Sequence, residues 1–164
     1  MAKIKGLRWW IVTLVALATV INYIDRSALA IMWPNISKDI GLTKIDYSRI
    51  AITFTIAYAI SQSLSGRFYD WVGTRIGFVI SIIVWSLSEI GHAVVSTVLS
   101  FAIVRFVLGL GEAGNWPGAT KSNAEWFPIK ERAFAQGIFN SGASIGSIIS
   151  PPLIAFLYLS LIHI

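Results

Sequence analysis

The chain has 164 residues, of which 55% are hydrophobic and only 13% are charged, and its formal net charge is +5. A soluble domain carries about 25% charged residues, so this composition and the mean hydropathy of +0.71 indicate a membrane protein. The absence of cysteine excludes disulfides, thiol catalysis and cysteine-ligated zinc. No basic face with interleaved aromatic residues indicates a nucleic-acid partner, and the two histidines, His92 and His163, lie too far apart to predict a metal site.

Five apolar segments follow one another along the chain, at residues 9–31, 49–66, 76–97, 98–120 and 133–157. Each reaches the ~20 residues that cross a hydrocarbon core of ~30 Å, although the second is short. Backbone groups must be hydrogen-bonded inside lipid, so we expect helices. The first segment also fits a secretory signal cleaved at Ala28–Ala30, but its long apolar run and the four later segments favour a membrane span. The sequence therefore predicts an all-α membrane protein.

The basic residues between the segments predict how the chain is oriented. Eight of them lie before the first segment or in the 66–75 and 121–132 stretches: Lys3, Lys5, Arg8, Arg67, Arg75, Lys121, Lys130 and Arg132. Only three, Lys38, Lys44 and Arg49, lie on the other side. Basic loops stay in the cytoplasm, so we expect a cytoplasmic N-terminus and an external 32–48 segment.

The chain ends directly after its fifth apolar segment. We therefore expect residues 1–164 to be a fragment of a larger membrane protein. Residues 157–164 carry no loop or cap signal and fit a foreign tail.

Four charged residues fall inside the predicted spans: Asp25, Arg26, Arg105 and Glu112. An ionisable side chain at mid-bilayer costs at least ~2.5–3.5 kcal/mol, so each is a functional hypothesis. Arg105, Gly109 and Glu112 lie at i, i+4 and i+7 and form one stripe on a helix. Gly109 leaves room there for a solute or for a neighbouring backbone. A purely structural ion pair is the alternative, but paired charges stay hydrated in a transport cavity, which favours function.

Asp25 and Arg26 are sequential, so they point about 100° apart around a helix. One can face a cavity while the other reaches a neighbouring helix. Burial raises the pKa of a carboxylate and a nearby arginine lowers it. A carboxylate held between these influences can load and release a proton as its arginine partner is exchanged for substrate, which is how a proton symporter works.

Small residues recur in the last two segments. The fourth segment contains Gly109, Gly111, Gly114 and Gly118, and Gly142, Gly146 and Ser150 follow one another every four residues in the fifth. Such rows let helices pack closely and slide, and plain tight packing is the simpler interpretation. Pro151 and Pro152 are expected to bend or end this helix.

The stretch between the second and third segments reads Gly66-Arg-Phe-Tyr-Asp70-Trp-Val-Gly73-Thr-Arg75. It resembles the loop signature of the major facilitator superfamily, Gly-x-x-x-Asp-Arg/Lys-x-Gly followed by basic residues. Asp70 can accept hydrogen bonds at a helix start, and Arg75 can hold it as the latch of a cytoplasmic gate. Trp71 stands where that family usually has a basic residue, so one latch charge is missing.

Further stretches are similar to those of the anion:cation symporter family, which transports hexuronates, galactonate, glucarate, sialate and phthalate. They are Asn22-Tyr23-Ile24-Asp25-Arg26, Arg105-x3-Gly109-x-Gly111, Glu125-Trp126-Phe127-Pro128, Lys130-Glu131-Arg132 and Phe139-Asn140-Ser141-Gly142. This resemblance covers residues 5–156. It implies a twelve-helix protein, of which the chain is most of the N-terminal six-helix bundle, with alternating access around a midplane site.

The same resemblance implies roles for individual residues. The proton-coupling set is Asp25, Glu112 and Arg105, and the substrate-binding set is Tyr23, Arg26, Tyr58 and Asn140, with Arg26 on the substrate carboxylate. Ala143 stands where galactonate-type members carry a glutamine, which favours a hexuronate-type substrate.

We therefore expect a monomeric symporter that imports a small organic anion such as a hexuronate with protons across the bacterial inner membrane. No metal or cofactor beyond the coupling protons is expected. An anion antiporter on the same fold and a transporter-like membrane sensor are the alternatives. An enzyme is disfavoured, because no nucleophile–base pair, metal cluster or phosphate loop is visible.

Overall fold

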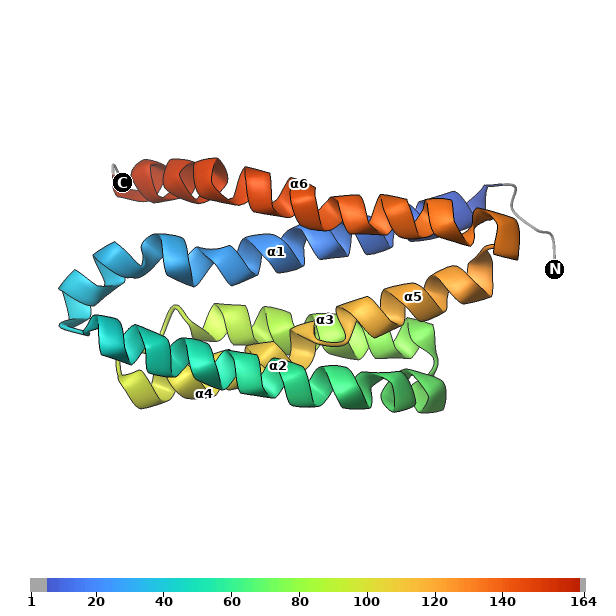
Figure 1. Ribbon diagram of the computed structural model, residues 1–164. Helices are drawn as coiled ribbons and strands as arrows, with labels where there is room; N and C mark the ends of the chain where they lie inside the picture. The colour runs from blue at the N-terminus through green and yellow to red at the C-terminus, as the bar shows by residue number, and fades with distance from the viewer. Residues whose placement is uncertain (1–5, 163–164) are drawn as a thin grey trace. The chain divides into compact units, whose positions relative to one another are not determined.

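The computed structural model describes residues 6–162, and these residues form six α-helices and no strand (Figure 1). The helices are α1 (Leu7–Ile40), α2 (Lys44–Val72), α3 (Thr74–Gly91), α4 (Val98–Glu112), α5 (Asn115–Trp126) and α6 (Ile129–Ile162). The all-α fold expected from the sequence is confirmed. Lys3, Lys5, His163 and the end of the predicted tail at 157–164 lie outside the described residues.

The chain divides into two compact units. Residues up to Met32 and from Ser122 onward form the first unit, and Trp33–Lys121 forms the second. The first unit therefore contains most of α1, the end of α5 and all of α6. The second unit contains α2, α3, α4 and the start of α5.

Four helical segments are long and apolar enough to cross a membrane: Leu7–Ile40, Thr74–Gly91, the α4–α5 stretch Val98–Trp126, and Ile129–Ser160. Their large apolar side chains are exposed, for example Leu14 (61%), Leu87 (63%) and Ile148 (74%). Exposed apolar surface of this extent fits contact with lipid. Helix α2 is long enough at 29 residues, but a polar run at residues 61–63 interrupts its apolar side chains.

Side-chain caps determine where α2 and α4 begin. The Asp46 backbone N–H donates to the Thr43 hydroxyl (3.3 Å), and the Thr43 N–H donates to the Asp46 carboxylate (2.9 Å). Helix α2 consequently begins at Lys44, ahead of the apolar segment expected from residue 49. A second capping box, Thr97 with Ser100, starts α4.

The connections on either side of α3 differ from the predicted segment 76–97. Gly73 has a φ of 80°, which residues with a side chain rarely adopt, and it separates α2 from α3. Helix α3 ends at Gly91, and a turn follows at residues 92–94 although the apolar run continues. The hydrophobicity of this short connection conceals the helix end in the sequence.

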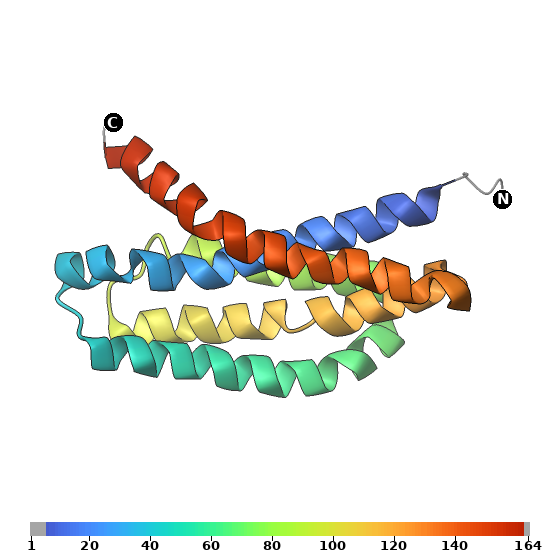
Figure 2. The same cartoon turned by 45° about the horizontal axis from the view of Figure 1, so that its top comes forward.

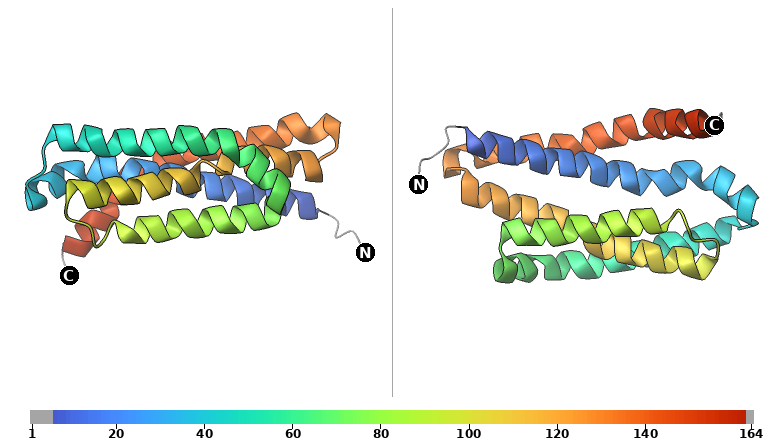
Figure 3. Two further views of the ribbon diagram at one scale, coloured as in Figure 1. Left: turned by 90° about the horizontal axis from the view of Figure 1, so that it is seen from below. Right: turned by 180° about the vertical axis from the view of Figure 1, so that it is seen from behind.

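In the second unit, α4 packs between α2 and α3, as the left panel of Figure 3 shows. A Cβ on Gly109 would lie 2.6 Å from the Phe54 carbonyl oxygen of α2. A Cβ on Gly111 would lie 2.8 Å from the Trp85 backbone nitrogen of α3. Neither position accepts a side chain without movement of a neighbouring backbone. The tight-packing interpretation is therefore confirmed for these two glycines.

In the first unit, α1 and α6 cross in close contact (Figure 2). Gly142 and Gly146 make this contact possible, because a Cβ on either would lie 2.6 Å from a carbonyl oxygen of α1. Helix α6 contains Pro151 and Pro152 and continues through both to Ile162. Its C-terminal part turns away from the line of the first part in Figure 2, so the prolines bend the helix without ending it.

The connection between α5 and α6 is held by charged side chains. Arg132 donates to the carbonyl oxygens of Ala124 in α5 (2.7 Å) and of Phe127 just after that helix (3.1 Å). Glu131 forms an ion pair of 3.0 Å with Arg8 at the start of α1. These contacts give the 125–132 stretch a structural role in the first unit.

Candidate functional site

The predicted charged stripe of α4 is buried. Arg105 is 4% exposed and Glu112 is 0% exposed. The space beside Gly109 is occupied by the α2 backbone around Phe54 and Tyr58. Of the two uses foreseen for that space, the structure shows a neighbouring backbone and no room for a solute.

Arg105 acts electrostatically on His92, a residue for which the sequence predicts no role. Burial and the positive charge of Arg105 lower the pKa of His92 to about 4. The His92 Nδ1 lies 2.9 Å from the Ser88 carbonyl oxygen and 3.5 Å from a carboxylate oxygen of Glu89. The i, i+3 spacing of Glu89 and His92 at the end of an apolar segment was the signal available in the sequence.

On α1, the Asn22–Arg26 stretch presents polar groups of different kinds. The Arg26 guanidinium lies 5.3 Å from the centre of the Tyr23 ring, within the range of a cation–π interaction. Asn22 is 0% exposed, and neither atom of its amide has a hydrogen-bond partner among residues 6–162. A buried amide of this kind calls for water or a polar ligand, because an unsatisfied buried polar group is costly. Asp25 is half-buried.

Three amide side chains line up in the first unit. The Asn123 Nδ2 donates to Gln136 Oε1 over 3.0 Å. The Gln136 Nε2 in turn donates to Asn140 Oδ1 over 3.3 Å. Asn123 on α5 is buried, at 4% exposure, whereas the predicted substrate residue Asn140 on α6 is exposed. The sequence drew attention to Asn140 alone.

The gate motif finds its ionic partner in α5. The Lys121 Nζ lies 2.6 Å from Asp70 Oδ1 and also donates to the Tyr69 carbonyl oxygen over 2.8 Å. No ion pair joins Asp70 to Arg75 within residues 6–162. The structure therefore gives the predicted latch of Asp70 a different cation. Gly66 and Gly73, the two glycines of the motif, both lie in open space.

Tyr69, near the C-terminal end of α2, packs against glycines of the neighbouring segments. Its side chain is fully buried, and its hydroxyl lies 3.3 Å from the Ser81 hydroxyl of α3. A Cβ on Gly77 would come within 2.5 Å of the ring, and one on Gly118 within 2.6 Å. Gly114, at the break between α4 and α5, is closed off by the same two side chains. The four-residue spacing of the glycines at 114 and 118 was the only hint in the sequence.

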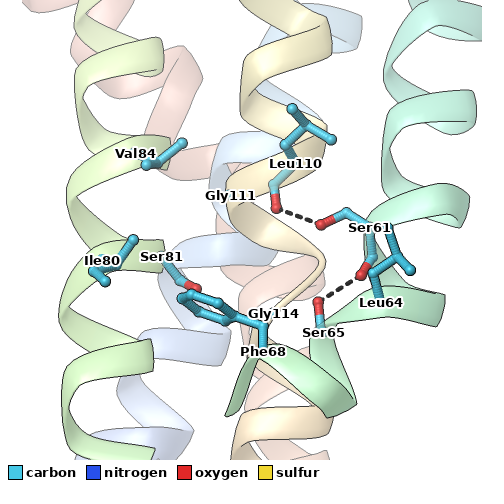
Figure 4. Close-up of a pocket in the computed structure, with 10 residues that line it drawn as sticks. All are labelled: Ser61, Leu64, Ser65, Phe68, Ile80, Ser81, Val84, Leu110, Gly111 and Gly114. Carbon is cyan, nitrogen blue, oxygen red and sulfur yellow. Dashed lines mark hydrogen bonds between the residues drawn. The ribbon is translucent and has the colours of Figure 1, made fainter. Parts of the chain in front are cut away.

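A cavity of about 290 Å³ lies between α2, α3 and α4 (Figure 4). The Ser61 hydroxyl donates to the Leu110 carbonyl oxygen (2.9 Å), and the Ser65 hydroxyl to the Ser61 carbonyl oxygen (2.6 Å). Both hydroxyls thus bond to helix backbone, one within α2 and one from α2 to α4. The remaining lining is largely apolar. None of the predicted substrate or proton residues lines this cavity. Tyr58 lies elsewhere on α2, stacked on Phe54 at 5.8 Å.

The fold and the buried charges together define an α-helical membrane protein with polar sites inside its spans, the construction of a solute transporter. Residues 15–163 match the family model described as Major Facilitator Superfamily. The chain belongs to this superfamily.

Named relatives agree with this assignment. The chain is 37% identical over 156 residues to a galacturonate transporter of Dickeya chrysanthemi, covering 95% of the chain and 45% of the relative. It is 36% identical over 156 residues to a hexuronate transporter of Escherichia coli (strain K12), covering 95% and 36%. The chain thus spans less than half the length of these two relatives.

The fold also matches solved structures. One is a bacterial homolog of the human lysosomal transporter Spinster, described as inward-facing and unoccupied. The TM-score is 0.84 with 22% sequence identity, over 89% of this chain and 31% of that one. The predicted family resemblance is therefore confirmed, and so is the expectation of a transporter family in place of an enzyme.

Proposed function

We propose that the protein containing this chain imports a small sugar acid, such as a hexuronate, together with protons across a bacterial inner membrane. The observation that carries this proposal is the identity of 36–37% with galacturonate and hexuronate transporters over 95% of the chain. The chain's own part is a membrane-embedded helical bundle with its N-terminus in the cytoplasm. The protein works as a monomer in the lipid bilayer, and protons are its only coupling ion.

On the substrate side, Arg26 is the group that receives the carboxylate. The face of the Tyr23 ring stabilises the guanidinium at 5.3 Å and limits its movement. A planar guanidinium suits bidentate contact with a carboxylate. Tyr58 and Asn140 supply hydroxyl and amide groups for the sugar.

Proton coupling is assigned to Asp25, Glu112 and Arg105. Glu112 has no exposed surface, so its ionised form depends on a compensating positive charge. Arg105 lies two helical turns earlier on the same buried face of α4. Arg105 pairs in turn with a carboxylate of the protein and with the substrate, and this change of partner links proton release to transport.

The motif at residues 66–75 is assigned to gating. Asp70 and Lys121 join the C-terminal end of α2 to α5 at the predicted cytoplasmic side. A partly exposed ion pair of this kind is weak enough to open during a transport cycle.

Uptake of labelled galacturonate by the full-length protein in vesicles, with and without an inward proton gradient, tests the proposal. We expect accumulation that collapses when the gradient is dissipated. Exchange of galacturonate without gradient-driven accumulation would assign an antiporter, and binding without movement across the membrane would assign a sensor.

A further inference from the structure

The three amides Asn123, Gln136 and Asn140 form a hydrogen-bonded chain with one direction. Each link uses the nitrogen of one side chain as donor and the oxygen of the next as acceptor, over 3.0 Å and 3.3 Å. The Asn140 oxygen is therefore occupied from inside. Its Nδ2, with two N–H donors, makes no hydrogen bond to any other residue of the described chain.

The free end of this amide chain lies inside the hydrocarbon core of the membrane. Asn140 follows the start of the apolar segment at residue 133 by seven positions, which is roughly 10 Å of helix at about 1.5 Å per residue. That is about a third of a ~30 Å hydrocarbon core. Two N–H donors without an acceptor are costly at such a depth, so they require a polar occupant.

The Asn140 side chain also faces away from the neighbouring helix of its own unit. Gln136 and Asn140 are four residues apart and share one stripe of α6. Gly142 and Gly146, which contact α1, lie on a different face. Asn140 is exposed, so α1 does not cover its side chain.

We propose that Asn123 and Gln136 are positioning residues that hold the Asn140 amide with its nitrogen outward, so that it donates to an acceptor oxygen of the transported sugar acid. The buried Asn123 donates to the oxygen of Gln136 and so directs the Gln136 nitrogen toward Asn140. This nitrogen in turn holds the Asn140 oxygen. An oxygen that can only accept, such as a carboxylate or ring oxygen, is selected, because an outward Asn140 oxygen would repel its lone pairs, whereas a hydroxyl could turn and donate. This inference rests on the proposed function, in which Asn140 contacts the substrate.

Gln136→Glu keeps the link from Asn123 and reverses the link to Asn140. An ionised carboxylate offers only acceptors, so Asn140 must turn its nitrogen inward and present its oxygen to the substrate. We expect the KM for galacturonate to rise about tenfold or more, as for a lost hydrogen bond to a charged group, with kcat within about twofold. Asn123→Asp reverses both links and should act in the same direction.

Three controls separate positioning from packing. Gln136→Met keeps the length of the side chain but holds neither orientation, so its KM should rise less than that of Gln136→Glu. Ser147→Ala, on the same stripe of α6, should leave the KM unchanged. A protonated carboxyl regains an O–H donor, so the KM of Gln136→Glu relative to the unaltered protein should fall toward one as the pH is lowered, whereas that of Gln136→Met should not.

The measurement is galacturonate uptake by full-length protein in proteoliposomes, normalised to folded protein, at several pH values. Equal KM increases for Gln136→Glu and Gln136→Met at every pH would overturn the positioning role. An unchanged KM in Asn140→Ala would overturn it as well, while leaving sugar-acid transport in place. Absence of uptake by the unaltered protein would refute the proposed function, and with it this inference.

Discussion

Breaking the contacts of Lys121 with the end of α2 should affect transport more than neutralising Asp70. The Asp70 side chain is 74% exposed, and an ion pair in such a position contributes about 0.2–1 kcal/mol. Asp70→Asn should therefore shift the equilibrium of the gate by about fivefold at most. Lys121, at 28% exposure, also donates to the Tyr69 carbonyl oxygen. Losing this charged hydrogen bond costs about 2 kcal/mol on top of the ion pair, so Lys121→Ala should shift the equilibrium of the gate by about 40- to 150-fold.

The assay combines the initial rate of uptake with the dissociation constant of the substrate, both in full-length protein and per folded molecule. We expect the rate to fall within these limits. The dissociation constant should stay within about twofold, because the motif at residues 66–75 gates the transporter and does not bind the substrate. Lys130→Ala is the matched control, since Lys130 is exposed at the start of α6 and has no ion pair in the described chain.

Equal losses in Asp70→Asn and Lys121→Ala would contradict the assignment of the Tyr69 carbonyl contact. Loss of substrate binding with an unchanged rate for bound substrate would show that Asp70 does not gate. A double-mutant cycle measures the ion pair directly, and its coupling energy should lie at about 0.2–1 kcal/mol.

Three further predictions concern stability and orientation. Gly109→Ala should destabilise the protein by about 1–3 kcal/mol, because its Cβ would meet the α2 backbone at 2.6 Å, whereas Gly66→Ala, with no atom within 4 Å, should melt normally. The pKa of His92 is lowered to about 4 from 6.5, so the free energy of unfolding should be constant above about pH 6.5 and should fall as the pH is lowered toward 4. His92→Asn should flatten this dependence of the melting temperature on pH. Single cysteines at Lys44 and Lys130 should label from opposite sides of the membrane, and labelling of both from outside would refute the predicted topology.

The fold class could be predicted from the sequence, because an apolar segment of membrane-spanning length satisfies its own backbone hydrogen bonds in lipid by forming a helix. The helix boundaries did not follow, since they depend on local caps. The Thr43–Asp46 box extends α2 beyond its apolar part, and apolar residues such as Val94 continue after α3 has ended at Gly91.

The candidate site was predicted in its residue types but not in its contacts. Arg105 and Glu112 stood out because charges in apolar segments are rare. The partner of Asp70 is a lysine 51 positions away in the chain, and no local pattern predicts such a pairing. The use of Gly109 was left open, because a glycine makes space without showing what fills it. The hydrogen bonds that connect Asn140 to Gln136 and Asn123 could not be predicted either. They join residues of two helices, and the donor and acceptor of each bond depend on how these helices pack.

The most direct test of the account compares two transport modes in Glu112→Gln. This variant resembles the protonated carboxyl permanently, so the carrier should still exchange galacturonate across the membrane but no longer release its proton and reset. In proteoliposomes of the full-length protein, normalised to folded protein, the unaltered carrier should show both counterflow and proton-driven uptake, whereas Glu112→Gln should keep counterflow and lose uptake. An equal loss of both modes in the variant would contradict the role of Glu112 in proton coupling.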